Sequence, residues 1–151
     1  MEHMKILLDT NVIVGLSEKG RRQMVAQAIE KIHAQGHDMF VVPQVIYEFW
    51  VVATRPAREH GLELSTERAG QAIQNALQVF GLLHDPAEIY NTWFDLVKDK
   101  KVAGKQAHDA RLAAAMAVHR LDAILTQNGR DFRRFSGITI IDPGHTVHAG
   151  S

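Results

Sequence analysis

Five acidic or amide side chains follow or interrupt apolar segments of the sequence, and side chains of these types can bind a metal ion. Asp9 comes directly after the apolar residues 6–8, and Asn128 and Asp131 follow the segment 123–126. A turn at the end of a strand is the simplest interpretation of Asp9, because aspartate is common in turns. The alternative is a carboxylate held at the end of a buried strand, where a ligand can reach it.

Two further carboxylates lie in segments with the pattern of helices. Glu48 interrupts the apolar segment VIYEFWVV, and Asp109 lies near the start of the alanine-rich segment QAHDARLAAAMAVHRL. A place on the solvent face of an amphipathic helix is the simple explanation of Glu48. Asp109 in a first helical turn stabilises the helix dipole by about 0.3–1 kcal/mol, whatever else it does. A shared site is the functional explanation of both.

Several carboxylates brought together repel one another unless a cation compensates their charge. Two unit charges about 4 Å apart repel by roughly 4 kcal/mol at an effective dielectric constant near 20. Protonation or a divalent cation relieves this repulsion. Oxygen ligands without cysteine or clustered histidine favour Mg²⁺, with Mn²⁺ as a second choice. Such an ion suits phosphate-ester chemistry, because it activates water and stabilises the charge of the transition state. These residues therefore predict a metal-dependent phosphoryl-transfer site.

Composition narrows the class of protein. The 151 residues suffice for one domain with a substantial core, and 17 basic residues balance 17 acidic ones, so the net charge gives no overall signal for nucleic acid. The absence of cysteine excludes disulfides and thiolate zinc sites. The start MEHMKILLD lacks the features of a signal peptide, and no apolar run approaches the roughly 18 residues of a membrane span, which predicts a cytoplasmic protein. We expect residues 1–143 to form one domain and residues 144–151 a tail, in which His145 and His148 form at most a weak metal pair.

The elements that must position the candidate site alternate between strands and helices. Short apolar runs predict strands at residues 5–8, 39–42, 80–83, 123–126 and 138–141. Helices are expected at about residues 20–35, 43–55, 66–78, from 85 to the charged segment KDKKVAGK, and at 106–121. Strands that are apolar on both faces and alternate with helices indicate an α/β fold with a central parallel sheet of about five strands. The carboxyl ends of such strands meet at one edge, where these sheets bind ligands, and all five candidate residues fall there.

Two helix starts have recognisable capping residues. Ser65 or Thr66 is expected to cap the helix that begins near residue 66. Asp85 is expected to cap the following helix, with Pro86 in its first position and Glu88 completing a capping box.

Four sequence elements in this order resemble the PIN domain family. They are LLDTNV near the N-terminus, YEF in a helix of the middle region, AHDARLAAA late in the chain, and the strand and turn LTQNGRDF. The resemblance covers about residues 4 to 142, and it is closest to the toxin ribonucleases of VapBC-type toxin–antitoxin pairs. It implies a three-layer α/β/α fold and a magnesium-dependent endoribonuclease.

The resemblance also implies roles for single residues. It makes Asp9, Glu48 and Asp109 the acidic core of the catalytic site, with Asp9 and Asp109 as the metal ligands. Thr10 and Asn11 match the family's Asp-Thr-Asn element and are expected to fix the loop of Asp9. A fourth acidic residue is common in the family two places after the threonine that ends the fourth strand, and this chain has Asn128 there. Asp131 either supplies the missing charge or caps the turn before Phe132. Independently, Asn128 with Gly129 either belongs to the site or is only a turn dipeptide.

The partners implied by the resemblance are an RNA substrate, a VapB-like antitoxin and a second copy of the chain. The homodimer would form through the helices near residues 43–55 and 66–80. Six basic residues near the site could line a path for RNA phosphates: Arg55, Arg58, Lys105, Arg130, Arg133 and Arg134. Attack by water, rather than by the 2′-hydroxyl, predicts products with a 5′-phosphate and a 3′-hydroxyl.

Three other functions are compatible with parts of the pattern. An aspartate-nucleophile phosphatase would have Asp-x-Asp after the first strand, but Asn11 occupies the third position here. A non-catalytic RNA- or protein-binding module would agree with Asn128, and the intact Asp9, Glu48 and Asp109 count against it. A PIN nuclease of RNA processing would share the catalytic residues without being a toxin.

Overall fold

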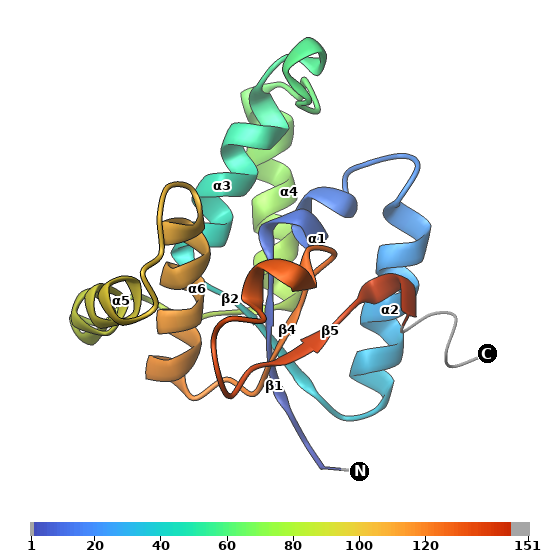
Figure 1. The fold of residues 1–151 in the computed structure, drawn as a ribbon. Coiled ribbons are helices and arrows are strands. Elements are labelled where there is room, and N and C mark those ends of the chain that lie inside the picture. The colour runs from blue at the N-terminus through green and yellow to red at the C-terminus, as the bar shows by residue number, and fades with distance from the viewer. Residues whose placement is uncertain (1, 146–151) are drawn as a thin grey trace.

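The computed structural model describes residues 2–145 and contains one sheet of five parallel strands (Figure 1). The strands run in the order β3-β2-β1-β4-β5, and every pairing between neighbours is parallel. Their bounds are β1 (Lys5–Leu8), β2 (Asp38–Val41), β3 (Gly81–Leu82), β4 (Ala123–Leu125) and β5 (Thr139–Ile141). The predicted parallel sheet is therefore confirmed, and the predicted strands differ from these bounds by no more than one residue at each end.

Strand β1 occupies the centre of the sheet, between β2 and β4. Its residues Ile6, Leu7 and Leu8 are fully buried, as expected of a parallel strand that helices cover on both faces. Leu8 pairs with Leu125 of β4, and the backbone N–H of Asp9 donates to the carbonyl of Leu125 at 3.0 Å. The central ladder thus holds the backbone of Asp9 at the carboxyl edge of the sheet.

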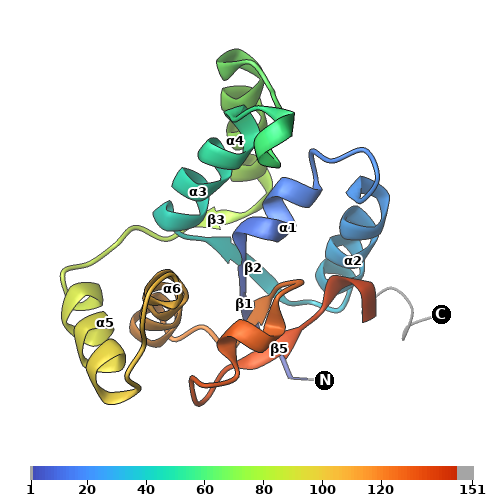
Figure 2. The ribbon, with the colours of Figure 1, turned by 45° about the horizontal axis from the view of Figure 1, so that its top comes forward.

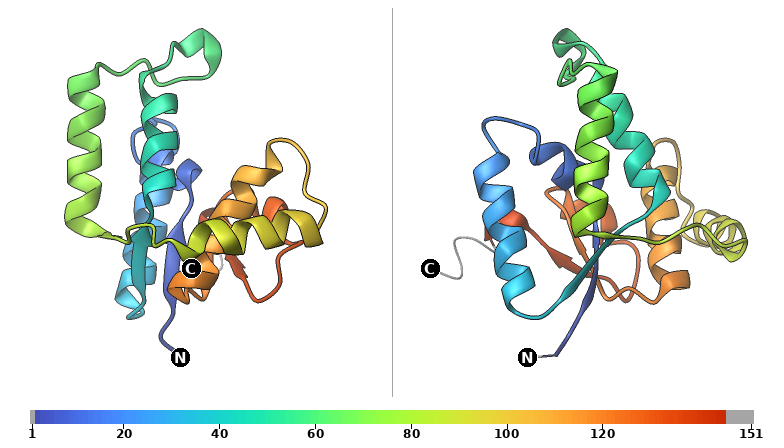
Figure 3. Two further views of the ribbon diagram at one scale, coloured as in Figure 1. Left: turned by 90° about the vertical axis from the view of Figure 1, so that its left-hand side faces the viewer. Right: turned by 180° about the vertical axis from the view of Figure 1, so that it is seen from behind.

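Helices cover the two faces of the sheet in the arrangement of an α/β/α fold. The α-helices are α1 (Thr10–Gly15), α2 (Arg22–Ala34), α3 (Pro43–Thr54), α4 (Thr66–Val79), α5 (Glu88–Asp99) and α6 (Gln106–His119), and the 3₁₀ helices are η1 (Ala57–Glu59) and η2 (Gly129–Phe132). Helices α1 and α2 lie on one side of the sheet, and α6, packed against α5, lies on the other (Figure 2). Helices α3 and α4 form an antiparallel pair that extends past the carboxyl ends of the strands (Figure 3).

Helix α1 was not predicted, because its six residues are too few to show helical periodicity. It follows β1 directly, and the side chain of its N-cap Asp9 accepts a hydrogen bond from the backbone of Thr10. Val12, Ile13 and Val14 are all buried, so packing rather than propensity stabilises this short helix. The chain turns sharply after β1, and the turn leaves Asp9 at the edge of the sheet.

The predicted capping role of Asp85 is wrong. Helix α5 begins at Glu88 with Ala87 as its N-cap, and no side chain caps it. The carboxylate of Asp85 instead accepts a hydrogen bond from the guanidinium of Arg111 at 2.8 Å. A charge-assisted bond of this kind is about twice as strong as a neutral one, which explains why Asp85 faces α6 rather than the start of α5.

The sequence predicts that the chain has no membrane span and ends in a short tail. Within residues 2–145, no helix is long and apolar enough to cross a membrane. Residues 146–151 of the expected tail, including His148, lie outside the described residues.

Replacing Ser65 with alanine should lower the free energy of unfolding by about 1 kcal/mol. The Ser65 hydroxyl is the N-cap of α4 and accepts a hydrogen bond from the backbone N–H of Arg68 at 3.1 Å. Urea unfolding of the wild type, Ser65→Ala and Ser65→Asp measures this loss. The aspartate variant keeps an acceptor and should match the wild type; equal losses in both variants would contradict the capping role.

Candidate active site

All five residues predicted from the sequence line one cavity of about 710 Å³ at the carboxyl edge of the sheet. Asp9 comes from the end of β1, Glu48 from α3 and Asp109 from the first turn of α6. Asn128 is the residue before η2, and Asp131 lies within η2. Four segments far apart in the sequence therefore deliver these side chains to one place, as the parallel topology requires.

Hydrogen bonds fix the carboxylate of Asp9. One oxygen, Oδ1, accepts from the backbone N–H of Thr10 at 2.7 Å. The other, Oδ2, accepts from the hydroxyl of Thr126 at 2.7 Å and from the amide of Asn11 at 3.3 Å. Asp9 is only 8% exposed, yet Oδ1 has a single donor and so retains capacity for another ligand.

Thr10 and Asn11 connect the loop of Asp9 to two other elements. The hydroxyl of Thr10 donates to Oε1 of Glu48 at 2.7 Å. The Asn11 side chain donates to the hydroxyl of Thr126 at 3.2 Å and accepts from the backbone N–H of Gln127 at 3.1 Å. The structure thus agrees with the expectation that these two residues fix the Asp9 loop, and it adds their contacts to α3 and to the segment after β4.

Gln44 orients Glu48 and was not among the residues predicted from the sequence. Gln44 is buried, and its amide N–H groups donate to the carbonyl of His108 at 2.9 Å and toward Oε2 of Glu48 at 3.4 Å. Its carbonyl oxygen accepts from Arg111 at 2.9 Å, and Arg111 also pairs with Asp85. One signal could have identified Gln44: it is a polar residue one helical turn before Glu48 in an otherwise apolar segment.

Burial and mutual repulsion raise the pKa values of two carboxyl groups in the cavity. Burial is the main cause of the raised pKa of Asp9, and hydrogen bonds from Thr126 and Thr10 partly oppose it. Burial, followed by the charges of Asp131, Asp9 and Glu48, raises the pKa of Asp109 to about 6. Ionising all of these groups together is therefore unfavourable without added positive charge.

The donor set fits a hard divalent cation. No three acidic or histidine side chains among residues 2–145 stand close enough together to hold an ion by themselves. Mg²⁺ does not need such a cluster, because it usually retains several waters and takes one or two carboxylates. Asp9 and Asp109 have the oxygen ligands it prefers, in surroundings that favour a positive charge.

The basic residues expected to contact RNA divide into separate groups. Arg55 and Lys105 line the acidic cavity, and so does Arg21, which was not predicted from the sequence. Arg130 and Arg133 line a neighbouring hollow that shares Asn128 and Asp131 with this cavity. Arg58 lies in η1, and Arg134 is hydrogen-bonded to Gln106 and to the carbonyl of Lys100.

Both the sequence and the fold of this chain match known proteins. A family model described as PIN domain matches residues 6–138. Similar solved structures include VapBC2 from Rickettsia felis bound to a DNA fragment from its promoter, at 15% identity and a TM-score of 0.70 over 92% of this chain and 98% of that one. A toxin–antitoxin complex from Klebsiella pneumoniae is 23% identical, with a TM-score of 0.62 over 89% and 95%. VapC20 from Mycobacterium tuberculosis, a toxin that cleaves the sarcin–ricin loop, is 20% identical, with a TM-score of 0.57 over 79% and 86%. A search of curated proteins found no match.

The raised pKa of Asp109 predicts a specific dependence of stability on pH. Between pH 3.8 and about 6 the folded protein should hold a proton on Asp109 that the unfolded chain has lost, so the free energy of unfolding falls as the pH rises through this window. Urea unfolding in EDTA across this window measures the effect, and Asp109→Asn should make the fall shallower, with the remainder due to the raised pKa of Asp9. The control is Asp95→Asn, on the exposed face of α5. A slope unchanged in Asp109→Asn would contradict the assignment.

Proposed function

The chain belongs to the PIN domain family, and on that premise we propose that it is a magnesium-dependent endoribonuclease, the toxin of a VapBC-type toxin–antitoxin pair. One observation supports this function above all others: Asp9, Glu48, Asp109 and Asp131 line the same cavity at the carboxyl edge of the sheet. The similar VapC20 of Mycobacterium tuberculosis is itself described as a toxin that cleaves the sarcin–ricin loop. The cytoplasmic location that the sequence suggests stays a prediction.

The reaction is the hydrolysis of an RNA phosphodiester bond. A water oxygen attacks phosphorus, the bond from phosphorus to the 3′-oxygen breaks, and this oxygen takes up a proton, which leaves a 5′-phosphate and a 3′-hydroxyl. Mg²⁺, when bound, supplies positive charge that stabilises the phosphorane-like transition state. Asp9 and Asp109 would hold the ion, and Asp9 reaches it with a carboxylate that three donors have already fixed.

Glu48 orients the attacking water. Its Oε1 is held by Thr10 and its Oε2 by Gln44, so the carboxylate has little freedom to rotate. Such fixed orientation lowers the entropic cost of bringing water and phosphate into line. The carboxylate of Asp131, rather than the amide of Asn128, would complete the negative charge of the site.

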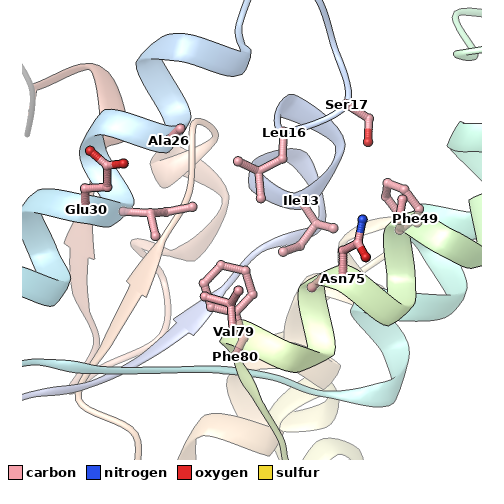
Figure 4. A pocket seen from close by; sticks show the side chains of 12 residues that line it. Ile13, Leu16, Ser17, Ala26, Glu30, Phe49, Asn75, Val79 and Phe80 are labelled. Atoms are coloured by element: carbon pink, nitrogen blue, oxygen red, sulfur yellow. The ribbon is translucent and has the colours of Figure 1, made fainter.

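An apolar pocket on another face fits the antitoxin. The pocket has a volume of about 350 Å³ and lies between α1, α2, α3 and α4 (Figure 4). Its walls include Ile13 of α1, Leu16 directly after α1, Ile29 of α2 and Val79 at the end of α4. An apolar side chain of a partner segment would remove these walls from water. The similar chain from Klebsiella pneumoniae was solved as a toxin–antitoxin complex, which supports a VapB-like partner for this chain.

Exposed apolar residues on α3 and α4 support the expected homodimer. Tyr47 and Val51 of α3 are 68% and 55% exposed and lie one helical turn apart, and Leu77 of α4 is 37% exposed. Exposed apolar side chains of this kind are typical of a protein interface.

Purified wild-type protein should cut RNA in Mg²⁺, and EDTA should abolish the cutting. Asp9→Asn should lower the rate by a factor of about 100 or more, because the asparagine can no longer supply negative charge to the ion. Cleavage of structured and single-stranded RNAs, with mapping of the product ends, measures this. A 2′,3′-cyclic phosphate product would contradict attack by water, and metal-independent RNA binding without cleavage would support the non-catalytic module instead.

Tyr47→Lys should convert a dimer into a monomer, because it places a charge in the apolar surface of α3. Light scattering of the wild type should give twice the mass of the 16.9 kDa chain, and the variant should give the single mass. The matched control is Tyr90→Lys, since Tyr90 is 62% exposed but lies on α5. A wild-type monomer would contradict the predicted dimer.

A further inference from the structure

Arg55 is a half-buried cation in the wall of the acidic cavity. Its Nε is buried and has no hydrogen-bond partner within residues 2–145, and its guanidinium forms no ion pair there. Burying a donor without a partner is unfavourable, so a protein keeps one only where something else compensates. Ligand binding is one such compensation.

The backbone of Arg55 is fixed on both sides. Its N–H donates to the carbonyl of Val51 at 3.1 Å, and its carbonyl accepts from the N–H of Glu63 at 3.0 Å. Gly61 of the same loop packs against it: a Cβ on Gly61 would lie 2.0 Å from the carbonyl oxygen of Arg55 and 2.3 Å from its Cγ. Only glycine permits this close approach, so the loop packs tightly against Arg55.

Arg55 is the C-cap of α3 and lines the same cavity as the carboxylates. It follows Glu48 by seven residues, or about 10 Å along the axis of the helix. A phosphate lying over the acidic residues would therefore lie within reach of the guanidinium.

Arg55 is not a counter-ion of the cavity carboxylates. Arg21, another cation of the same cavity, is already bonded to Glu18 and Gln127. Arg55 shares the cavity with Asp9, Glu48, Asp109 and Asp131 but pairs with none of them. A guanidinium that stays apart from nearby carboxylates remains available to an anion that enters the cavity.

We propose that Arg55 binds the non-bridging oxygens of the scissile phosphodiester and stabilises the negative charge that develops there. The planar guanidinium can donate two parallel hydrogen bonds to a phosphate, which an ammonium group cannot do. The role rests on the proposed RNA-cleaving function, since that function brings a phosphodiester to this cavity. It makes Arg55 a catalytic residue rather than a structural one.

Arg55→Gln should lower kcat by about 100-fold, the effect of removing one donor from a charged transition state. Arg55→Lys should keep only part of the wild-type kcat, because lysine has the positive charge but cannot donate two parallel hydrogen bonds. The matched control is Arg68→Gln, an exposed arginine on α4 of the same helical pair, which should cleave like the wild type.

Two further readouts separate this role from a structural one. Urea unfolding of Arg55→Gln should show stability equal to or above that of the wild type, because the Arg55 side chain makes no hydrogen bond or ion pair within residues 2–145 that the change could remove. Binding of a fluorescein-labelled single-stranded RNA of mixed sequence in EDTA should weaken, and the slope of log K against log salt should become shallower by about 0.7, the value for one phosphate contact. Loss of stability together with activity, or rates equal to those of Arg68→Gln, would overturn the role of Arg55 alone. A wild type that neither binds nor cuts RNA would overturn the nuclease function with it.

Discussion

Repulsion among carboxylates at one edge of the sheet is the constraint on which the arrangement of this site depends. Asp9, Glu48, Asp109 and Asp131 line one cavity, and the pKa of Asp109 rises to about 6 under burial and the charges of the other three. Each carboxylate comes from a different element, so none can move away without disturbing the sheet or a packed helix. The stability of the three-layer core therefore offsets the electrostatic cost of keeping these charges together.

Neutral donors hold the carboxylates, which leaves their negative charge intact. Asp9 is fixed by a threonine, an asparagine and a backbone N–H, and Glu48 by Thr10 and Gln44. Two arginines close to the site are engaged elsewhere: Arg111 pairs with Asp85 and donates to Gln44, and Arg21 pairs with Glu18. Hydrogen bonds from neutral groups restrict rotation without supplying the full charge of an ion pair. The site is thus ordered and keeps its negative charge, as the proposed metal-dependent hydrolysis requires.

The sequence predicted the sheet and the approach of Asp9, Glu48 and Asp109 because both follow from topology. Apolar runs define parallel strands, and parallel strands carry their ends to one edge. The pairing of Arg111 with Asp85 and Gln44 could not be found in this way, because it joins residues 26 and 67 positions apart whose side chains meet only through tertiary packing. Local pattern instead favoured Asp85 as a helix cap, and a stronger charged partner outweighed that preference.

The geometry of η2 explains how the site can tolerate asparagine at position 128. A 3₁₀ helix has three residues per turn, so side chains three positions apart lie nearly one above the other. Asn128 precedes η2 as its N-cap, and Asp131 lies three residues later within it. Both line the acidic cavity, and Asp131 is the first among the charges that raise the pKa of Asp109. A carboxylate three positions later in the sequence therefore lines the same cavity as Asn128.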